Sequence, residues 1–113
     1  MTVFEKIDLR TLGEAQPVDV DYPIADIQQG SLLLLNQRPK GYGWECHGVA
    51  ERIIVIDGEV SIVTDGEEEL TAYQGEMIVI PAGLRHAYHP DSNGVVAVVF
   101  GGTANNQEST KCV

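Results

Sequence analysis

Two short stretches of the sequence carry side chains that could bind a metal ion or transfer a proton. The first contains Glu45, His47 and Glu51, and the second contains His86 and Tyr88. In a β-strand, residues two positions apart lie on the same face of the sheet, so Glu45 and His47 share a face. The same rule puts His86 and Tyr88 on one face of the second stretch. Glu51 begins a further strand, whose alternation decides where its carboxylate points.

Four of these residues form a plausible ligand set for one divalent transition metal. The set is Glu45, His47, Glu51 and His86. Facing a common interior, they would offer two imidazoles and two carboxylates, and without Glu45 they would match the two-histidine, one-carboxylate triad of non-haem iron sites. Two neighbouring carboxylates without a cation would repel each other and raise one pKa, which favours a bound cation. The residues do not select among iron, manganese, nickel and zinc.

Several neighbouring residues have more than one interpretation. Glu45 is either a metal ligand or a non-ligating carboxylate that acts as a general base and proton shuttle. Tyr88 is either a catalytic hydrogen-bond donor in the pocket or a core residue. Trp44 and Cys46 alternate away from Glu45, so we expect them to pack rather than to touch a substrate. Cys46 and Cys112 have no metal-binding or redox spacing, which predicts reduced thiols.

The elements that must position these residues are predicted to be short strands. Glycines and prolines divide the chain after residue 30 into strand-length pieces, a pattern typical of all-β proteins. The apolar run Ser31–Gln37 predicts a strand buried on both faces, and Asp57-Gly58 and Asp65-Gly66 predict tight hairpin turns. Two further strands are predicted over Met77–Ile80 and Val95–Phe100. About eight antiparallel strands would close into a sandwich or a barrel, including a jelly roll.

The two ends of the chain show weaker patterns. Phe4, Ile7 and Leu9 are compatible with an edge strand, and Thr11–Pro23 is predicted to be a loop. No helix of ordinary length is predicted. Residues 102–113 are polar and are expected to form a flexible tail.

The first stretch resembles the first motif of the cupin superfamily. That motif contains a glycine, five residues, His-x-His, three or four residues, a glutamate, six residues and a glycine. His47 matches the second histidine, and Glu51 and Gly58 follow at the motif's spacing. The chain departs from the motif at Glu45, which replaces the first histidine, and at Pro39, where strict counting places the opening glycine.

The second stretch resembles the second cupin motif, which contains a glycine, five residues, Pro-x-Gly, two residues, a histidine, three residues and an asparagine. The matching residues are Gly75, Pro81, Gly83 and His86. The closing asparagine is replaced by Pro90. Two motifs in the right order with the right internal spacing are a specific signal, and the resemblance is strongest over residues 41–90.

The resemblance implies a small cupin with an all-β jelly-roll barrel that encloses the metal. It implies one domain over residues 1–101, followed by the tail at 102–113. Related activities include dioxygenases, isomerases and lyases, so the family implies a metal-dependent enzyme acting on a small molecule without selecting the reaction. The alternative is a non-catalytic cupin that binds a metal or small ligand. The small size of the chain gives this alternative weight.

Composition narrows the range of partners. The formal net charge is −10, which disfavours nucleic acid and anionic membrane surfaces. The chain has no apolar run long enough to span a bilayer and no visible signal peptide, which predicts a cytoplasmic protein. We expect a homodimer, because a small cupin needs cover for an apolar outer face that includes Ile54 and Ile56.

Overall fold

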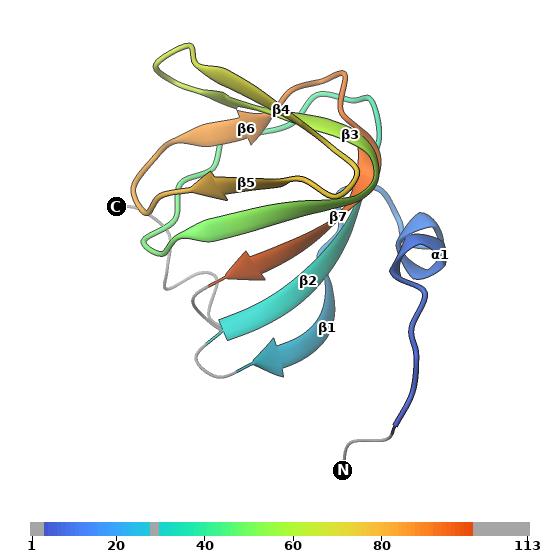
Figure 1. Ribbon diagram of the computed structural model, residues 1–113. Helices are drawn as coiled ribbons and strands as arrows, with labels where there is room; N and C mark the ends of the chain where they lie inside the picture. Colours follow the sequence, from blue (N-terminus) through green and yellow to red (C-terminus); the bar gives the residue numbers. More distant parts are fainter. Residues whose placement is uncertain (1–3, 28–29, 101–113) are drawn as a thin grey trace.

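The computed structural model describes residues 4–27 and 30–100 (Figure 1). Within these ranges the elements are α1 (Leu9–Glu14), β1 (Tyr22–Ile27), β2 (Gly30–Gln37), β3 (Glu51–Thr64), β4 (Glu69–Tyr73), β5 (Met77–Ile80), β6 (His86–Tyr88) and β7 (Asn93–Phe100). All strand pairings are antiparallel, in the order β1-β2-β7-β3-β4, and β5 and β6 also pair with β3. The strands curve around one interior, which confirms the all-β, antiparallel barrel-like architecture predicted from the sequence (Figure 1).

The predicted turn at Asp57-Gly58 is wrong, because β3 continues through both residues. The register with β7 shifts between Val55 and Asp57, which marks a β-bulge. Gly58 has a φ of 81° and passes so close to the backbone of Asn93 that a Cβ would collide with it. The sequence signal was real, since Asp-Gly does place a residue at positive φ. Here that conformation bends a long strand instead of reversing it.

Strand alternation in the rest of the chain follows the prediction. β2 is buried on both faces, with only Leu32 half-exposed. In β3, Glu51, Ile53 and Val55 are buried while Arg52 is exposed. The Asp65-Gly66 turn joins β3 to β4, and β5 ends at Ile80 before Pro81, as predicted. The buried side of β3 therefore carries Glu51 into the same interior as the apolar core.

The N-terminal region differs from the prediction. The structure has no strand at Phe4–Leu9, and a short helix occupies part of the predicted loop. Asp8 caps α1 by accepting hydrogen bonds from the backbone N–H and the hydroxyl of Thr11, at 3.1 and 3.0 Å. Asp8 is therefore the local signal that the sequence analysis missed.

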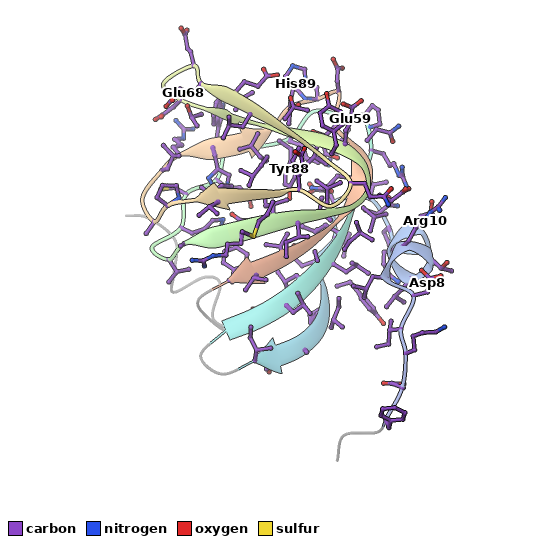
Figure 2. The ribbon with its side chains drawn as sticks, in the orientation of Figure 1. Asp8, Arg10, Glu59, Glu68, Tyr88 and His89 are labelled. Carbon is purple, nitrogen blue, oxygen red and sulfur yellow. The ribbon has the colours of Figure 1, made fainter. Side chains whose placement is uncertain are left out.

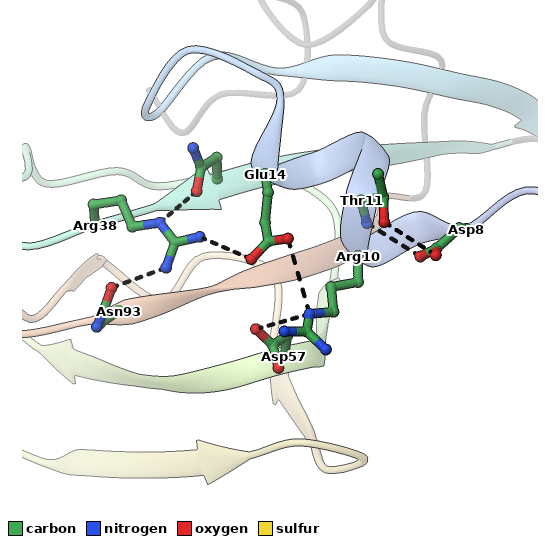
Figure 3. Close-up of polar contacts among 8 residues, drawn as sticks. Asp8, Arg10, Thr11, Glu14, Arg38, Asp57 and Asn93 are labelled. Carbon is green, nitrogen blue, oxygen red and sulfur yellow. Dashed lines mark hydrogen bonds and ion pairs between the residues drawn. The ribbon is translucent and has the colours of Figure 1, made fainter.

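Helix α1 covers the outer face of β2 and β7. Gly13 lies so close to Val95 and Leu34 that a Cβ there would overlap the Val95 side chain. Ion pairs connect the helix to the sheet, from Arg10 to Asp57 and from Arg38 to Glu14 (Figure 3). In the described ranges, no helix is long and apolar enough to cross a membrane.

Candidate functional site

The site forms where two loop segments meet the start of β3 and β6. Glu45 and His86 form an isolated antiparallel bridge, and Gly83 donates a backbone hydrogen bond to the carbonyl of His47 at 2.8 Å. These bonds bring the two predicted stretches side by side. Glu51 reaches the same place from β3, where it lies opposite Ile80 of β5 and Phe100 of β7.

The candidate ligand atoms lie close together. One ligand atom from each of Glu45, His47 and His86 lies within 4.8 Å of the other two. Glu51 Oε1 lies 3.1 Å from Nε2 of His86 and 3.6 Å from Nε2 of His47. The structure therefore brings Glu45, His47 and His86 into one group of possible ligands, and Glu51 joins it through its contacts with the two histidines.

Burial differs across the cluster. His47, Glu51 and His86 are 7%, 4% and 1% exposed, whereas Glu45 is exposed at the mouth of the site. The rings of His47 and Phe100 pack edge to face, with ring centroids 4.8 Å apart. The two histidines and Glu51 thus lie in a low-dielectric environment, and Glu45 lies between them and solvent.

The hydrogen bonds of His86 fix which ring nitrogen faces the cluster. Its Nδ1 lies 2.9 Å from the carbonyl oxygen of Leu84, which can only accept, so Nδ1 carries a proton. Nε2 is then the nitrogen that points to Glu51. Burial lowers the pKa of His86, but the hydrogen bonds with Glu51 and Leu84 outweigh it, so the pKa is raised.

The carboxyl group of Glu45 is a weaker acid than an ordinary glutamate. Loss of hydration at the cavity mouth raises the pKa of Glu45 to about 7, and the nearby Glu51 carboxylate adds to the rise. His86 opposes it. In the metal-free protein Glu45 is thus close to half-protonated at neutral pH.

Tyr88 lies inside the barrel, while Glu68 and His89 lie at its periphery (Figure 2). The hydroxyl oxygen of Tyr88 is buried and has no hydrogen-bond partner of good geometry in the described part of the chain. Burial raises the pKa of Tyr88 well above its usual value, and the carboxylates of Glu51 and Glu45 raise it further. The phenol therefore stays protonated and is available to a ligand.

Two adjoining cavities lie beside the cluster. The inner one has a volume of about 30 Å³ and is lined by residues that include His47, Glu51 and Phe100. The outer one has a volume of about 220 Å³. It is lined by Asp19, Tyr42, Gly43, Trp44, Glu45 and Tyr88. Asp19, Glu45 and Tyr88 line both cavities, so the two cavities adjoin and the outer one lies beside the inner one.

Sequence reasoning missed three residues of the outer cavity. Trp44 was expected to pack away from any substrate, but it is 47% exposed and lines the outer cavity. It precedes the Glu45 bridge in a loop, where strand alternation does not apply. Asp19 and Tyr42 carry no motif signal, and they reach this cavity only because their loops lie near Gln37 and Tyr88.

The expectation for Cys46 also needs correction. Cys46 is disulfide-bonded in the structure, so the predicted reduced thiol is wrong. The other cysteine of the sequence, Cys112, lies outside the described residues. Spacing along the sequence carried no signal for this bond, and the thiol argument for a cytoplasmic location no longer holds.

Comparison with known proteins agrees with the geometry. The model of the family described as "Cupin domain" matches residues 34–101, which is more than half of the chain. The chain belongs to the cupin family. A search of curated proteins found no match.

Solved cupin-like structures share the fold of this cupin. Protein NMB1881 from Neisseria meningitidis is 18% identical, with a TM-score of 0.73, covering 85% of this chain and 98% of that one. A cupin-2 domain containing protein from Shewanella frigidimarina is 22% identical, with a TM-score of 0.68 and coverage of 79% and 86%. A cupin superfamily protein from Desulfitobacterium hafniense is 14% identical, with a TM-score of 0.71 and coverage of 88% and 93%. At these identities the similarity concerns the fold alone.

Proposed function

We propose that this cupin binds one divalent transition metal and uses it to act on a small molecule that enters through the outer cavity. The proposed ligands are Glu45, His47, Glu51 and His86. The observation that carries the proposal is the convergence of both histidine Nε2 atoms on Glu51 Oε1 in a buried pocket. Two imidazoles and two carboxylates suit iron, manganese, nickel or zinc.

The donor set fits a cation for two reasons. His86 donates Nδ1–H to Leu84, which is the outer hydrogen bond expected of a metal-binding histidine, and this leaves Nε2 for the metal. The charges of Glu45 and Glu51 would balance a divalent ion, whereas without one the Glu51 carboxylate disfavours the ionisation of Glu45. A metal bound there would polarise a substrate oxygen or nitrogen as a Lewis acid.

The surrounding side chains support an enzyme. If the other three residues are sufficient to hold the metal, Glu45 is free to accept or return a proton at the entrance, and its pKa of about 7 suits that task at neutral pH. The protonated hydroxyl of Tyr88 can donate a hydrogen bond to the substrate. We assign these two residues as the candidate catalytic groups.

A non-catalytic binding protein is the second candidate. The inner cavity is only about 30 Å³ in volume. His47, Glu51 and His86 are proposed metal ligands. Among the other described residues that line the cavities, sequence and geometry together favour Glu45 and Tyr88 as acid–base groups. A protein with such a small inner cavity can hold a metal and a small ligand without turnover.

Metal analysis of protein purified without a histidine tag tests the proposed site. We expect about one equivalent of metal per chain in the wild type and loss of that metal in His47→Ala and His86→Ala. His89→Ala is the matched control, because His89 lies outside the cavities and accepts a hydrogen bond from the Asp91 backbone. Unchanged metal content in both site variants would overturn the proposal.

Three broader expectations stay predictions. We propose that residues 1–101 act as one cupin domain and that residues 102–113, which lie outside the described residues, form a tail. We also propose a homodimer and a cytoplasmic location. The match to the cupin family supports the first of these expectations, and the apolar outer face of the sheet supports the dimer.

A further inference from the structure

The wall of the outer cavity combines aromatic rings with hydrogen-bond acceptors. Tyr42, Trp44 and Tyr88 supply three rings, and Asp19 and Glu45 supply two carboxyl groups. Among the described residues, no lysine or arginine lines either cavity. Such a wall attracts cations through carboxylates and ring faces, and it offers little to a carboxylate or phosphate.

The chain's own cations already occupy this kind of surface. The ammonium of Lys40 lies 3.2 Å from Asp19 Oδ2 and 5.0 Å from the centre of the Tyr42 ring. The guanidinium of Arg85 lies 5.3 Å from the centre of the Trp44 ring. The Asp19 carboxylate with the Tyr42 ring is thus a geometry that holds an ammonium group.

Asp19 is held in place by the fold. Its φ is 62°, its backbone N–H donates to the carbonyl of Asn36 at 3.0 Å, and its Oδ1 accepts from Gln37 Nε2 at 3.2 Å. The side chain remains 37% exposed, so a ligand can reach it. A non-glycine residue at positive φ is uncommon, and asparagine and aspartate tolerate it best.

Tyr88 gives an independent sign of a ligand. The residue is 5% exposed and lines both cavities, and its buried hydroxyl makes no hydrogen bond of good geometry among the described residues, although the Gln37 side chain is close enough to lower its pKa. Buried polar atoms are usually paired. An N–H donor of a bound molecule would satisfy this oxygen while the molecule's charge faces Asp19.

We propose that the natural ligand of this cavity is a small molecule with a protonated amine, held between Asp19 and the rings of Tyr42 and Trp44. This assignment rests on the proposed function, in which the outer cavity is the entrance to the metal. It adds the chemical class of the ligand. It also assigns Asp19 as a specificity-determining residue.

Three probes with one skeleton separate charge from shape. They are 2-phenylethylamine, 2-phenylethanol and phenylacetate. Binding is followed by calorimetry and by fluorescence, because Trp44 is the chain's single tryptophan and lines the cavity. We expect the amine to bind at least roughly tenfold more tightly than the alcohol or the carboxylate, a difference of about 1.4 kcal/mol. Equal or tighter binding of phenylacetate would overturn the proposal.

Matched variants test the assigned residue. Asp19→Asn keeps the shape and tolerates the positive φ, and we expect it to lower amine affinity roughly tenfold with little effect on the alcohol. Asp91→Asn removes an exposed carboxylate outside the cavities and should leave binding unchanged. Lys40→Met removes the internal competitor and should tighten amine binding. Unchanged amine affinity in Asp19→Asn would also overturn the proposal.

The same titrations are run on metal-free and zinc-loaded protein, so that the two proposals can fail separately. Amine preference without zinc binding would support the ligand assignment and overturn the metal site. Zinc binding without amine preference would overturn the ligand assignment and leave the metal site supported. Circular dichroism of each variant shows that a loss of binding is not a loss of folding.

Discussion

The backbones of Glu45 and His86 exchange two hydrogen bonds, from Glu45 N–H to the His86 carbonyl at 2.7 Å and from His86 N–H to the Glu45 carbonyl at 2.9 Å. Residues paired in this way lie directly opposite each other, with their side chains on the same face of the sheet. The backbone alone therefore directs the side chain of residue 45 to the same side as that of His86. A different ligand at position 45 would point at the same cluster.

This pairing predicts the effect of changing residue 45. Glu45→His, which restores the histidine of the cupin motif, should retain metal binding, because the backbone still directs the side chain at His86. Glu45→Ala should lower metal affinity roughly tenfold or more if Glu45 is a ligand. Zinc titration by calorimetry measures both. Glu59→Ala removes an exposed carboxylate outside the cavities and serves as the control, and an unaltered affinity in Glu45→Ala would make the residue a non-ligating carboxylate.

The raised pKa of Glu45 predicts a dependence of stability on pH in the metal-free protein. The folded state holds a proton on Glu45 up to about pH 7, whereas the unfolded chain releases it near its ordinary value of 4.5. The folded state therefore binds more protons between these values, and stability falls as the pH rises from about 4.5 to 7. His86 has a raised pKa as well, so its contribution has the same sign above its ordinary value.

The variant Glu45→Gln isolates this contribution. Relative to Glu45→Gln, we expect the metal-free wild type to lose stability between pH 5 and pH 7.5, measured as the melting temperature after dialysis to remove metal. Comparison of the two proteins at each pH cancels the other acidic groups. A wild type that gains stability relative to Glu45→Gln over this range would show that Glu45 is not destabilised by burial and by Glu51.

The candidate ligands could be predicted because strand alternation and motif spacing, which are local features of the sequence, determine their positions. Alternation fixes the face of Glu51 within β3, and the motif spacing fixes which histidines approach it. The entrance could not be predicted in the same way. Asp19 lies there because a parallel bridge between Val18 and Asn36 joins segments far apart in the chain, and no local pattern encodes that contact.

Two of the differences between the predicted and the observed elements have one cause. Local propensity favours a turn at Asp57-Gly58 and a loop before Tyr22, but long-range pairing and packing decide the structure of both segments. β7 pairs with β3 on both sides of Gly58, so the chain bends there and continues. The packing of Gly13 against Leu34 and Val95 similarly favours a helix where the pattern suggested a loop.

The close approach of Gly58 to the backbone of Asn93 predicts a localised sensitivity to mutation. Gly58→Ala places a Cβ at positive φ against the backbone of Asn93, and backbone cannot move aside as a side chain can. We expect a loss of roughly 2 kcal/mol or more in the free energy of unfolding. Gly41→Ala is the control, since a Cβ there has no neighbour within 4 Å. Chemical denaturation of both variants checks this, and equal stabilities would contradict the close approach of Gly58 to Asn93.

The outer face of β3 and β5 predicts self-association. Ile54 is half-buried and lies opposite Met77, and Met77 and Val79 are 51% and 49% exposed. If this face is the homodimer interface, Met77→Glu should shift the protein to monomer by placing charges in it. Sedimentation at micromolar concentration measures the state, and Glu68→Gln is a control at the protein periphery. A wild type that is wholly monomeric would contradict the expected dimer.

Metal binding should stabilise the folded protein, and this stabilisation should grow as the pH rises. The stability of the metal-free protein is expected to fall over the same range. An ion that binds only the folded state stabilises it by about 2.7 kcal/mol at a hundredfold excess over the dissociation constant. Zinc should therefore raise the melting temperature of the wild type, and a chelator should reverse the rise. The shift should shrink at pH 5, because His47 and His86 must be neutral to bind the ion. His86→Ala should abolish the shift, since it removes one of the two imidazoles in the proposed ligand set, whereas His89→Ala should retain it. A zinc-dependent shift of full size in His86→Ala would place the ion elsewhere on this acidic chain.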